Sequence, residues 1–276
     1  MRLRGVKSSR NVDDRRRSGA GKAGGIGGVG LLLVLAIGYF AGIDVTPFLN
    51  QTAAPAQTQA TSAEQDQAAE FSTRVLATTE QVWGQIFAQQ LNRTYQPPVL
   101  VLYSGVTQSP CGGASGATGP FYCPADQKAY LDTDFFVTLS RQMGANGDFA
   151  AAYVIAHEVA HHVQNLIGIL GPVDQRRRQV SEAEANGLTV RLELQADCLA
   201  GVWARSVQGL LERGDLEEAL NAARRIGDDH LQRQAGRVPQ PHTFTHGTSE
   251  QRSRWFARGY DGGNISECDS FGARSL

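Results

Sequence analysis

The 276-residue sequence contains no Cys-x-x-Cys pair, no internal repeat and no basic surplus beyond its first 22 residues. Without the Cys-x-x-Cys spacing, a zinc site built from cysteines is not expected. Residues 1–22 have a net charge of +6, which leaves −7 on the rest of a chain whose total is −1. An acidic body lacks the electrostatic footprint of a nucleic-acid-binding protein, so nucleic acid is not an expected partner. A composition of 41% apolar and 19% charged residues excludes wholesale disorder and collagen-like structure.

A long uncharged run follows the basic residues. Residues 23–43 are 21 consecutive positions without a charge, and most of the second half of the run is apolar. At 1.5 Å per residue, a helix of this length can cross a hydrocarbon core of about 30 Å. We therefore expect a single-pass membrane protein, with residues 1–22 cytoplasmic and the body periplasmic or otherwise extracytoplasmic. Two alternatives stay open: a buried core helix, which the glycines at the start of the run disfavour, and a signal peptide cleaved near Ala54-Pro55-Ala56.

The stretch after the uncharged run is polar and of low complexity. Residues 50–69 contain seven Ala, five Gln and three Thr, which is typical of a flexible spacer. The sequence thus predicts a basic head (1–22), a transmembrane anchor (23–43), a spacer (44–69) and one folded domain (70–276).

The number of cysteines fits an exported body. An even set of four is typical of disulfide-bonded proteins outside the cytoplasm, and three pairings are possible. We favour Cys111–Cys123, which closes a short Gly-rich loop, and Cys198–Cys268 as the second pair. Four free buried thiols are the alternative.

Hydrophobic periodicity and breaker residues predict a mainly helical α+β domain with a small β-sheet. Helices are expected over residues 70–92, 134–143, 148–167, 181–208, 215–226 and 249–258, and strands over residues 99–103 and 128–131. The segment 148–167 is apolar nearly all round, so we expect this helix to be buried.

A His-Glu-x-x-His motif, from His157 to His161, lies within that buried helix. Residues four apart share one helical face, so both imidazoles can bind one metal ion. Glu158 projects about 100° away from His157, where it can act on a water activated by the metal. Catalytic zinc needs three protein ligands, an open position for water and a carboxylate to take its proton. A purely structural role for the three polar side chains is the alternative.

The expected helix 181–208 offers a third ligand. Glu193 and Asp197 are four residues apart and therefore lie on one face. We expect Glu193 to bind zinc and Asp197 to accept the outward N–H of a ligand histidine. For Glu193 the alternative is a solvated surface charge. His162 is the alternative ligand, although it points about 100° away from His161 on a helix.

His246 is the remaining histidine with an informative context, in a loop that leads into the last helix. Its imidazole could hydrogen-bond the oxyanion of a tetrahedral intermediate, and Arg252 could hold that imidazole or bind a carboxylate. Ordinary surface positions are the alternative for both residues. His230 and His242 are expected to be surface or structural residues.

These residues also carry a resemblance to the bacterial family known as putative neutral zinc metallopeptidases, single-span proteins with a gluzincin-like site. The matching stretches cover most of the chain outside the spacer: residues 11–16, 130–136, 147–149, 157–165, 193–198, 226–229 and 245–252. The resemblance implies a zincin-like peptidase domain, zinc as cofactor, and roles for His157, His161, Glu193 and Glu158. It supplies no particular substrate.

Together these features predict a membrane-anchored, zinc-dependent endopeptidase that acts on proteins or peptides, with Glu158 as general base and then general acid. We expect residues 99–102 or 128–131 to form the edge strand beside the cleft, where a substrate can add as a further strand. Two other classes stay open: a proteolytically silent zinc-binding module, and a membrane-tethered interaction protein whose basic head contacts anionic lipid or a cytoplasmic partner.

Overall fold

The computed structural model describes residues 1–16, 62–115, 119–136, 139 and 147–276. The described residues form a mainly helical α+β structure with one four-stranded and one two-stranded sheet. The strands are β1 (Val12–Asp14), β2 (Val99–Tyr103), β3 (Val106–Ser109), β4 (Gly112–Ser115), β5 (Phe121–Cys123) and β6 (Lys128–Asp132). The α-helices are α3 (Ser62–Gln90), α5 (Asp148–Leu166), α6 (Leu170–Arg177), α7 (Glu182–Ser206), α8 (Asp215–Arg225), α9 (Asp228–Gln234) and α10 (Ser249–Gly262). Three 3₁₀ turns are also present: η1 (Gln208–Leu210), η2 (Pro241–Thr243) and η3 (Ile265–Cys268).

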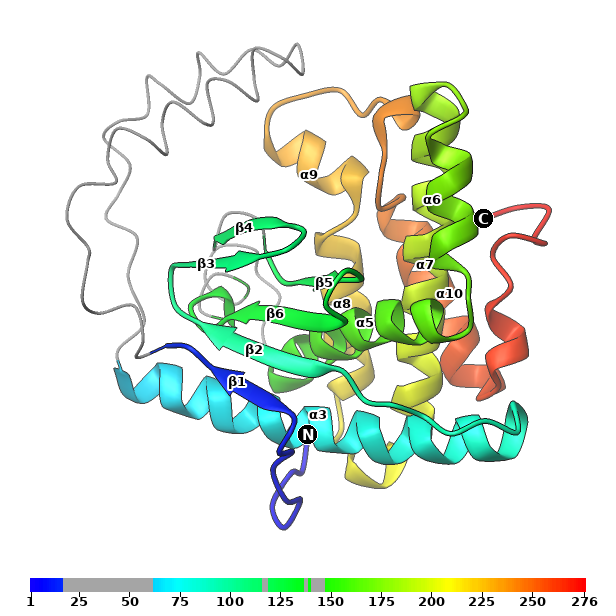
Figure 1. Cartoon of the computed structure of the whole chain (residues 1–276). Coiled ribbons are helices and arrows are strands. Elements are labelled where there is room, and N and C mark those ends of the chain that lie inside the picture. The colour runs from blue at the N-terminus through cyan, green and yellow to red at the C-terminus, as the bar shows by residue number, and fades with distance from the viewer. Residues whose placement is uncertain (17–61, 116–118, 137–138, 140–146) are drawn as a thin grey trace, which may run out of the picture.

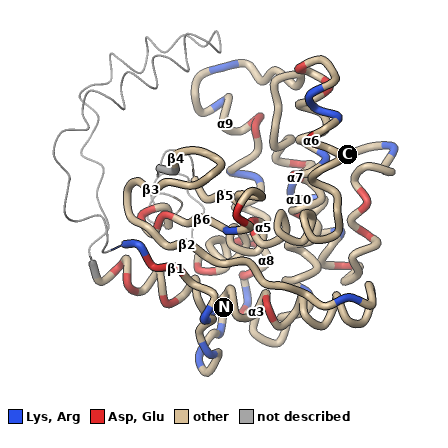
Figure 2. The backbone as a smooth tube through the Cα atoms, viewed as in Figure 1, with Lys and Arg blue, Asp and Glu red and all other residues tan. Residues whose placement is uncertain are grey.

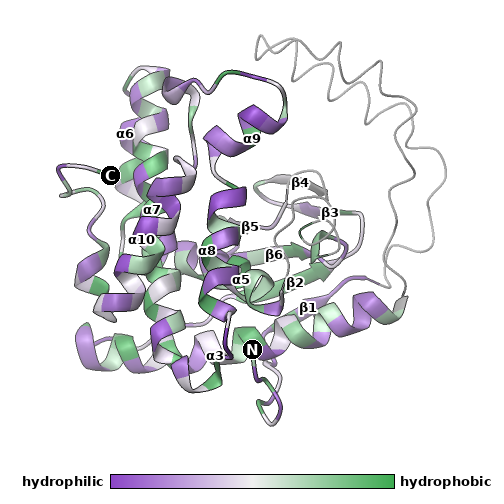
Figure 3. Ribbon diagram, turned by 180° about the vertical axis from the view of Figure 1, so that it is seen from behind, coloured by the Kyte–Doolittle hydropathy of each residue, from purple (hydrophilic) through white to green (hydrophobic). Residues whose placement is uncertain are grey.

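Helix α5 lies at the centre of the molecule. It contacts β5 and β6 of the sheet on one side and α7 and α8 on the other, while α3 runs beneath it (Figure 1). Most of α5 is buried, as its apolar sequence predicts. The strands β2 and β6 are likewise hydrophobic, whereas the peripheral α9 is largely hydrophilic (Figure 3). Charged residues of both signs lie along the outer helices α3 and α6 (Figure 2).

The four-stranded sheet has the order β1-β2-β6-β5, in which β1, β2 and β6 are parallel and β5 is antiparallel to β6. The expectation that residues 99–102 or 128–131 form the edge strand is therefore wrong, because both lie in the interior of the sheet. Their outer neighbours β1 and β5 are each three residues long, too short to show the alternation that identifies a strand in a sequence.

Helices α7 and α10 pack unusually closely. A Cβ on Gly201 would lie 2.1 Å from the Phe256 carbonyl oxygen, and a Cβ on Gly259 would lie 1.8 Å from the Cys198 carbonyl oxygen. Only glycine allows this approach of one backbone to the other. The contact keeps α10 beside the part of α7 that contains Asp197, and Arg252 of α10 hydrogen-bonds this predicted site residue.

The N-terminal residues pack against the rest of the structure. Met1 and Leu3 are buried, and β1 pairs with β2 with Val12 opposite Leu100. The Glu80 carboxylate on α3 accepts hydrogen bonds from the Ser9 hydroxyl and the Asn11 amide. Residues 1–16 therefore form part of the same folded unit as the described residues after Ser62, whereas the sequence predicts a separate head.

Helix α3 begins at Ser62, eight residues before the predicted start of ordered structure. Its first turns are held by tertiary contacts: the Gln65 amide donates to Ser104 and Asp134, and Arg16 pairs with Asp66. The predicted spacer is thus shorter than its composition indicates. The predicted anchor, residues 23–43, lies outside the described residues, and most of the predicted helix 134–143 does too. Among the helices that the structure describes, none has the length and apolar character of a membrane span.

Candidate metal centre

Helix α5 positions His157 and His161 on adjacent turns of one face, with their ring centroids 4.8 Å apart. His157 is 5% exposed. The apolar residues around the motif bury the helix, so the His157 imidazole is buried and that of His161 is partly buried, with 16% of its side chain exposed.

Glu193 reaches the same place from α7. Its Oε2 lies 3.0 Å from His157 Nε2, and its Oε1 lies 3.5 Å from His161 Nε2. The three side chains each offer one ligand atom, and these atoms lie within 4.8 Å of one another. Two imidazole nitrogens and one carboxylate are a ligand set typical of catalytic zinc, so the residues fit this metal.

Asp197 holds His157 from the opposite side of the ring. His157 Nδ1 lies 2.8 Å from Asp197 Oδ1 and donates to it, so Nε2 is the nitrogen that faces Glu193 and that a metal ion can bind in place of a proton. Arg252 donates to both carboxylate oxygens of Asp197, and the Tyr153 hydroxyl donates to Oδ1 at 2.5 Å. Of the two roles considered for Arg252, the structure shows the carboxylate contact.

His161 is held by Gln164, which the sequence did not single out. His161 Nδ1 lies 2.9 Å from Gln164 Oε1, three residues further along α5. An amide oxygen only accepts hydrogen bonds, so Nδ1 carries the proton and Nε2 is free to bind a metal. The spacing of three residues between His161 and Gln164, which places both on one face of α5, could have indicated this contact.

The ligand side chains carry opposite charges. Burial lowers the pKa of His157, but Asp197 and Glu193 outweigh this effect and raise it to about 10. Burial raises the pKa of Glu193, but the two histidines hold it well below its usual range. A metal ion that binds here therefore replaces a proton, and the metal provides the positive charge that the carboxylates need.

Glu158 lies next to His157 on α5. Burial raises the pKa of its carboxyl group, and the nearby His161 and His157 oppose this rise only in part. A raised pKa suits a carboxylate that must accept a proton and later release it near neutral pH.

His246 is 49% exposed in its side chain and contacts Asp228, not Arg252. Asp228 Oδ2 also accepts hydrogen bonds from the backbone N–H groups of Thr245, His246 and Gly247. A Cβ on Gly247 would lie 3.3 Å from side-chain atoms of Val190 and Leu194 on α7, three residues before and one residue after Glu193. The loop of His246 thus passes beside the helix that carries the third ligand, although no contact joins His246 to the three ligands. The role of Asp228 in holding this loop was not predicted from the sequence.

His162 lies away from the three ligands. Its Nε2 is 2.7 Å from the Gln96 carbonyl oxygen, and its Nδ1 is 3.0 Å from the Tyr122 hydroxyl. Burial lowers the pKa of His162, so its ring is neutral. Its two hydrogen bonds join α5 to β5 and to the segment before β2. With both nitrogens engaged there, His162 does not replace Glu193 as a ligand. The structure describes His230 and His242, and neither belongs to the cluster of His157, His161 and Glu193.

Two disulfides are present, Cys111–Cys123 and Cys198–Cys268, which are the pairs favoured from the sequence. The first joins the turn between β3 and β4 to β5. The second joins α7, one residue after Asp197, to η3 near the C-terminus.

Comparisons with known proteins find a family model and several relatives that match the chain. Residues 1–271 match the family model described as "Putative neutral zinc metallopeptidase". The chain is 49% identical over 286 aligned residues to "Uncharacterized protein YpfJ" of Escherichia coli K12, covering 99% of each chain. It is 45% identical over 195 residues to "Uncharacterized protein Rv2575" of Mycobacterium tuberculosis H37Rv, covering 66% of this chain and 65% of the relative. No solved structure matches the chain.

Proposed function

Because the chain belongs to the putative neutral zinc metallopeptidase family, we propose that it is a zinc-dependent endopeptidase. The convergence of His157, His161 and Glu193 supports this proposal most directly. Both imidazoles have Nδ1 hydrogen-bonded, so each can bind an ion through Nε2 once the ion displaces the proton there. An intact Glu158 beside the ligands favours catalysis over a silent zinc-binding module.

In this proposal His157, His161 and Glu193 hold the zinc ion. When bound, zinc supplies a Lewis acid that polarises a peptide carbonyl and lowers the pKa of water. Glu158 removes the proton from the attacking water and then delivers it to the leaving amine. Asp197 and Gln164 keep the two imidazoles in the tautomer that binds the metal.

His246 is the proposed donor to the oxyanion that forms on the substrate. Asp228 supports this role because it holds both the imidazole and the backbone of residues 245–247. The role requires the exposed imidazole to approach the substrate carbonyl. Replacing His246 by Ala should therefore lower kcat more than it raises KM.

The proposed substrates are proteins or peptides in extended conformation. Among the described strands, β5 lies at the edge of the four-stranded sheet and contacts α5, so its outer side is the proposed place for a substrate strand. Addition of a strand at this edge would lay the substrate backbone along the helix that carries His157 and His161.

An extracytoplasmic location is also part of the proposal, and the two disulfides support it. Attachment through residues 23–43 in a single crossing stays a prediction. Such a crossing would put residues 1–16 and 62–276 on opposite sides of the membrane. In the structure, β1 pairs with β2, so the packed arrangement and a single crossing exclude each other within one molecule.

The proposed function is tested by metal analysis and peptide cleavage with the full-length protein, because residues 1–16 form part of the fold. We expect one zinc per chain and cleavage of a peptide library. Glu193→Gln keeps the side-chain size but removes the charge, so it should lose zinc and activity together. Full zinc content and full activity in this variant would exclude Glu193 as a ligand.

A further inference from the structure

The two ligand histidines differ in what holds them from behind. His157 Nδ1 contacts the carboxylate of Asp197, which Arg252 in turn anchors. His161 Nδ1 contacts the neutral side-chain amide of Gln164 at 2.9 Å. A neutral amide has no charge to fix its orientation, so its own hydrogen bonds must do this.

Gln164 is fully buried, and all its polar atoms have partners. Its Nε2 donates to the Leu192 carbonyl oxygen at 2.7 Å and to Gln195 Oε1 at 3.0 Å. Rotation of the amide by 180° would place its NH₂ group against the Nδ1–H of His161 and its oxygen against two acceptors. The two acceptors on α7 therefore determine which atom of Gln164 faces His161.

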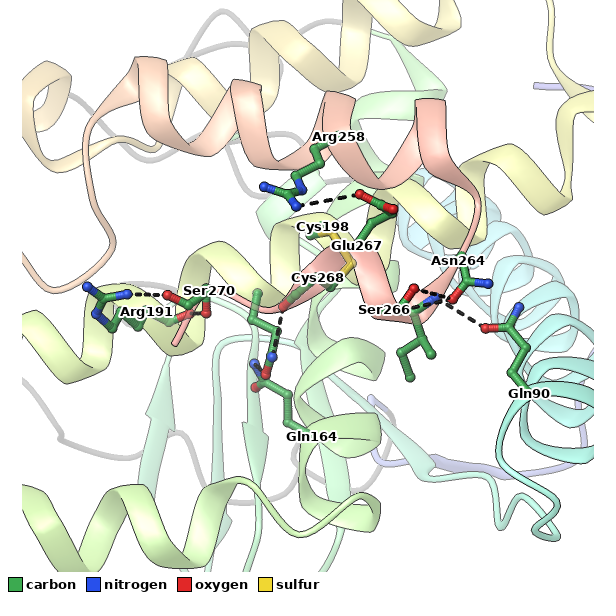
Figure 4. Close-up of a disulfide and its surroundings, with 12 residues drawn as sticks. Gln90, Gln164, Arg191, Cys198, Arg258, Asn264, Ser266, Glu267, Cys268 and Ser270 are labelled. Carbon is green, nitrogen blue, oxygen red and sulfur yellow. Dashed lines mark hydrogen bonds and ion pairs between the residues drawn. A yellow bond between two sulfur atoms is a disulfide. The ribbon is translucent and has the colours of Figure 1, made fainter. Parts of the chain in front are cut away.

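Gln195 is oriented in the same way. Its Nε2 donates to the Cys268 carbonyl oxygen at 2.9 Å, which leaves its Oε1 directed at Gln164. Cys268 is bonded to Cys198, three residues after Gln195 on α7 (Figure 4). The hydrogen bonds thus run in one direction from His161 through Gln164 and Gln195 to a carbonyl group that a disulfide attaches to α7.

We propose that Gln164, Gln195 and the Cys198–Cys268 disulfide form a relay that positions His161 for metal binding. The inference rests on the proposed function, since it concerns the same metal site. Gln164 and Gln195 are positioning residues, because they act through His161. The buried disulfide holds the last acceptor of the relay in place.

The physical basis is the orientation of a ligand by the group behind it. Loss of such a group typically lowers metal affinity 10–100-fold. Without the Cys268 carbonyl, Gln195 loses the acceptor that sets its orientation, and Gln164 then loses one of the two acceptors that set its own. The His161 ring is then free to rotate or to change tautomer, and both changes weaken binding at Nε2.

The same C-terminal segment offers a matched control. Gln90 on α3 accepts a hydrogen bond from the Ile265 backbone N–H at 3.2 Å but takes no part in the relay (Figure 4). Gln90→Leu and Gln195→Leu therefore each remove one glutamine contact to the C-terminal segment, and only the second interrupts the relay. The other disulfide, Cys111–Cys123, provides the same comparison for cysteine pairs.

The test uses the metal-free full-length protein and measures zinc affinity by competition with a chromophoric chelator. The visible spectrum of the Co²⁺-substituted protein serves as a second readout of ligand geometry. We expect Gln195→Leu to weaken zinc binding about 10-fold and Gln164→Leu to weaken it 10–100-fold, each with an altered Co²⁺ spectrum. Gln90→Leu should keep wild-type affinity and spectrum. The Cys198→Ser/Cys268→Ser pair should behave like Gln195→Leu, and the Cys111→Ser/Cys123→Ser pair like the wild type.

Gln195→Leu keeps both disulfides, so it decides the question even where the cysteine variant does not fold. If Gln195→Leu and Gln164→Leu kept wild-type zinc affinity and an unchanged Co²⁺ spectrum, the relay would be overturned but the proposed function would not. An equal loss of affinity in Gln90→Leu would overturn it too, because packing of the C-terminal segment would then explain the effect. If the wild-type protein bound no zinc, or if His157→Ala bound zinc as tightly as the wild type, the proposed function would be overturned and the relay with it.

Discussion

Arg252 Nε lies 2.9 Å from Asp197 Oδ2, and both side chains are buried between α7 and α10. The guanidinium group also donates to Asp197 Oδ1, which gives the two-pronged geometry of a strong ion pair. Together with His157, it keeps the pKa of Asp197 below its usual value despite burial. The pair thus connects α10 to the carboxylate that orients His157, one of the proposed metal ligands.

Replacing Arg252 should therefore affect stability strongly. Arg252→Met keeps much of the side-chain volume but leaves the Asp197 charge buried without its main partner, which typically costs about 3–5 kcal/mol. Urea unfolding monitored by circular dichroism measures the change. Arg254→Met on the same helix is the matched control, because Arg254 is 52% exposed and its contact with Glu250 is about 4.0 Å. An exposed pair of this kind contributes about 0–1 kcal/mol, so equal losses in the two variants would contradict the prediction.

The Asp228 side chain gives the fold a specific sensitivity to acid. Burial raises its pKa, but the hydrogen bonds from His246 and Gly247 outweigh this effect and lower it below the ordinary value of 3.8. A group whose pKa is lowered by folding contributes stability above its unfolded pKa and loses that contribution as the pH falls through the folded value. The wild type should therefore be more stable than Asp228→Asn above about pH 4, and the difference should shrink at lower pH.

Unfolding free energies of both proteins, measured from pH 7 to pH 2.5, test this dependence. Comparing the two proteins cancels the titration of other carboxylates. A difference that stays constant over the whole range would show that the charge of Asp228 does not stabilise the loop.

The packing of residues 1–16 can be tested by chemical cross-linking. Lys128 Nζ lies 3.7 Å from Asp13 Oδ2 across the sheet, and the chain has only three lysines. A carbodiimide that joins an amine directly to a carboxylate should link these two residues in the full-length protein in its native membrane fraction. Peptide mapping should recover the cross-linked peptide, and Lys128→Gln should abolish it. Failure to recover it from folded, disulfide-bonded protein would favour the single crossing, with residues 1–16 and the body on opposite sides.

The three residues of the candidate metal site could be picked out from the sequence because helical periodicity places them on shared faces. His157 and His161 share a face by their spacing, and Glu193 with Asp197 repeats that spacing on a second helix. The residues that hold the ligands gave weaker signals. Gln164 is neutral, and its role depends on Gln195 and the Cys268 carbonyl, which are distant in the sequence.

The short elements of the fold escaped prediction for similar reasons. The strand β1 contains two aspartates in three residues, and its place in the sheet depends on pairing with β2 and on the contact of Asp13 with Lys128 of β6. Helix α9 is polar on nearly every side, so it lacks the apolar periodicity that identifies a helix. The long apolar segment α5 was predictable because burial on all sides leaves a continuous hydrophobic signal.

The sharpest prediction separates metal binding from catalysis at Glu158. Glu158→Gln should keep the fold and one zinc per chain, because the three proposed ligands are His157, His161 and Glu193. An amide can still hydrogen-bond a water molecule, but it cannot accept and return a proton as a carboxylate does. General acid–base catalysis contributes about 10²–10⁴-fold, so kcat should fall by at least this factor while KM changes little. His157→Ala should instead lose zinc and activity together. Equal zinc loss in both variants would make Glu158 a ligand, and wild-type turnover by zinc-loaded Glu158→Gln would place the base elsewhere.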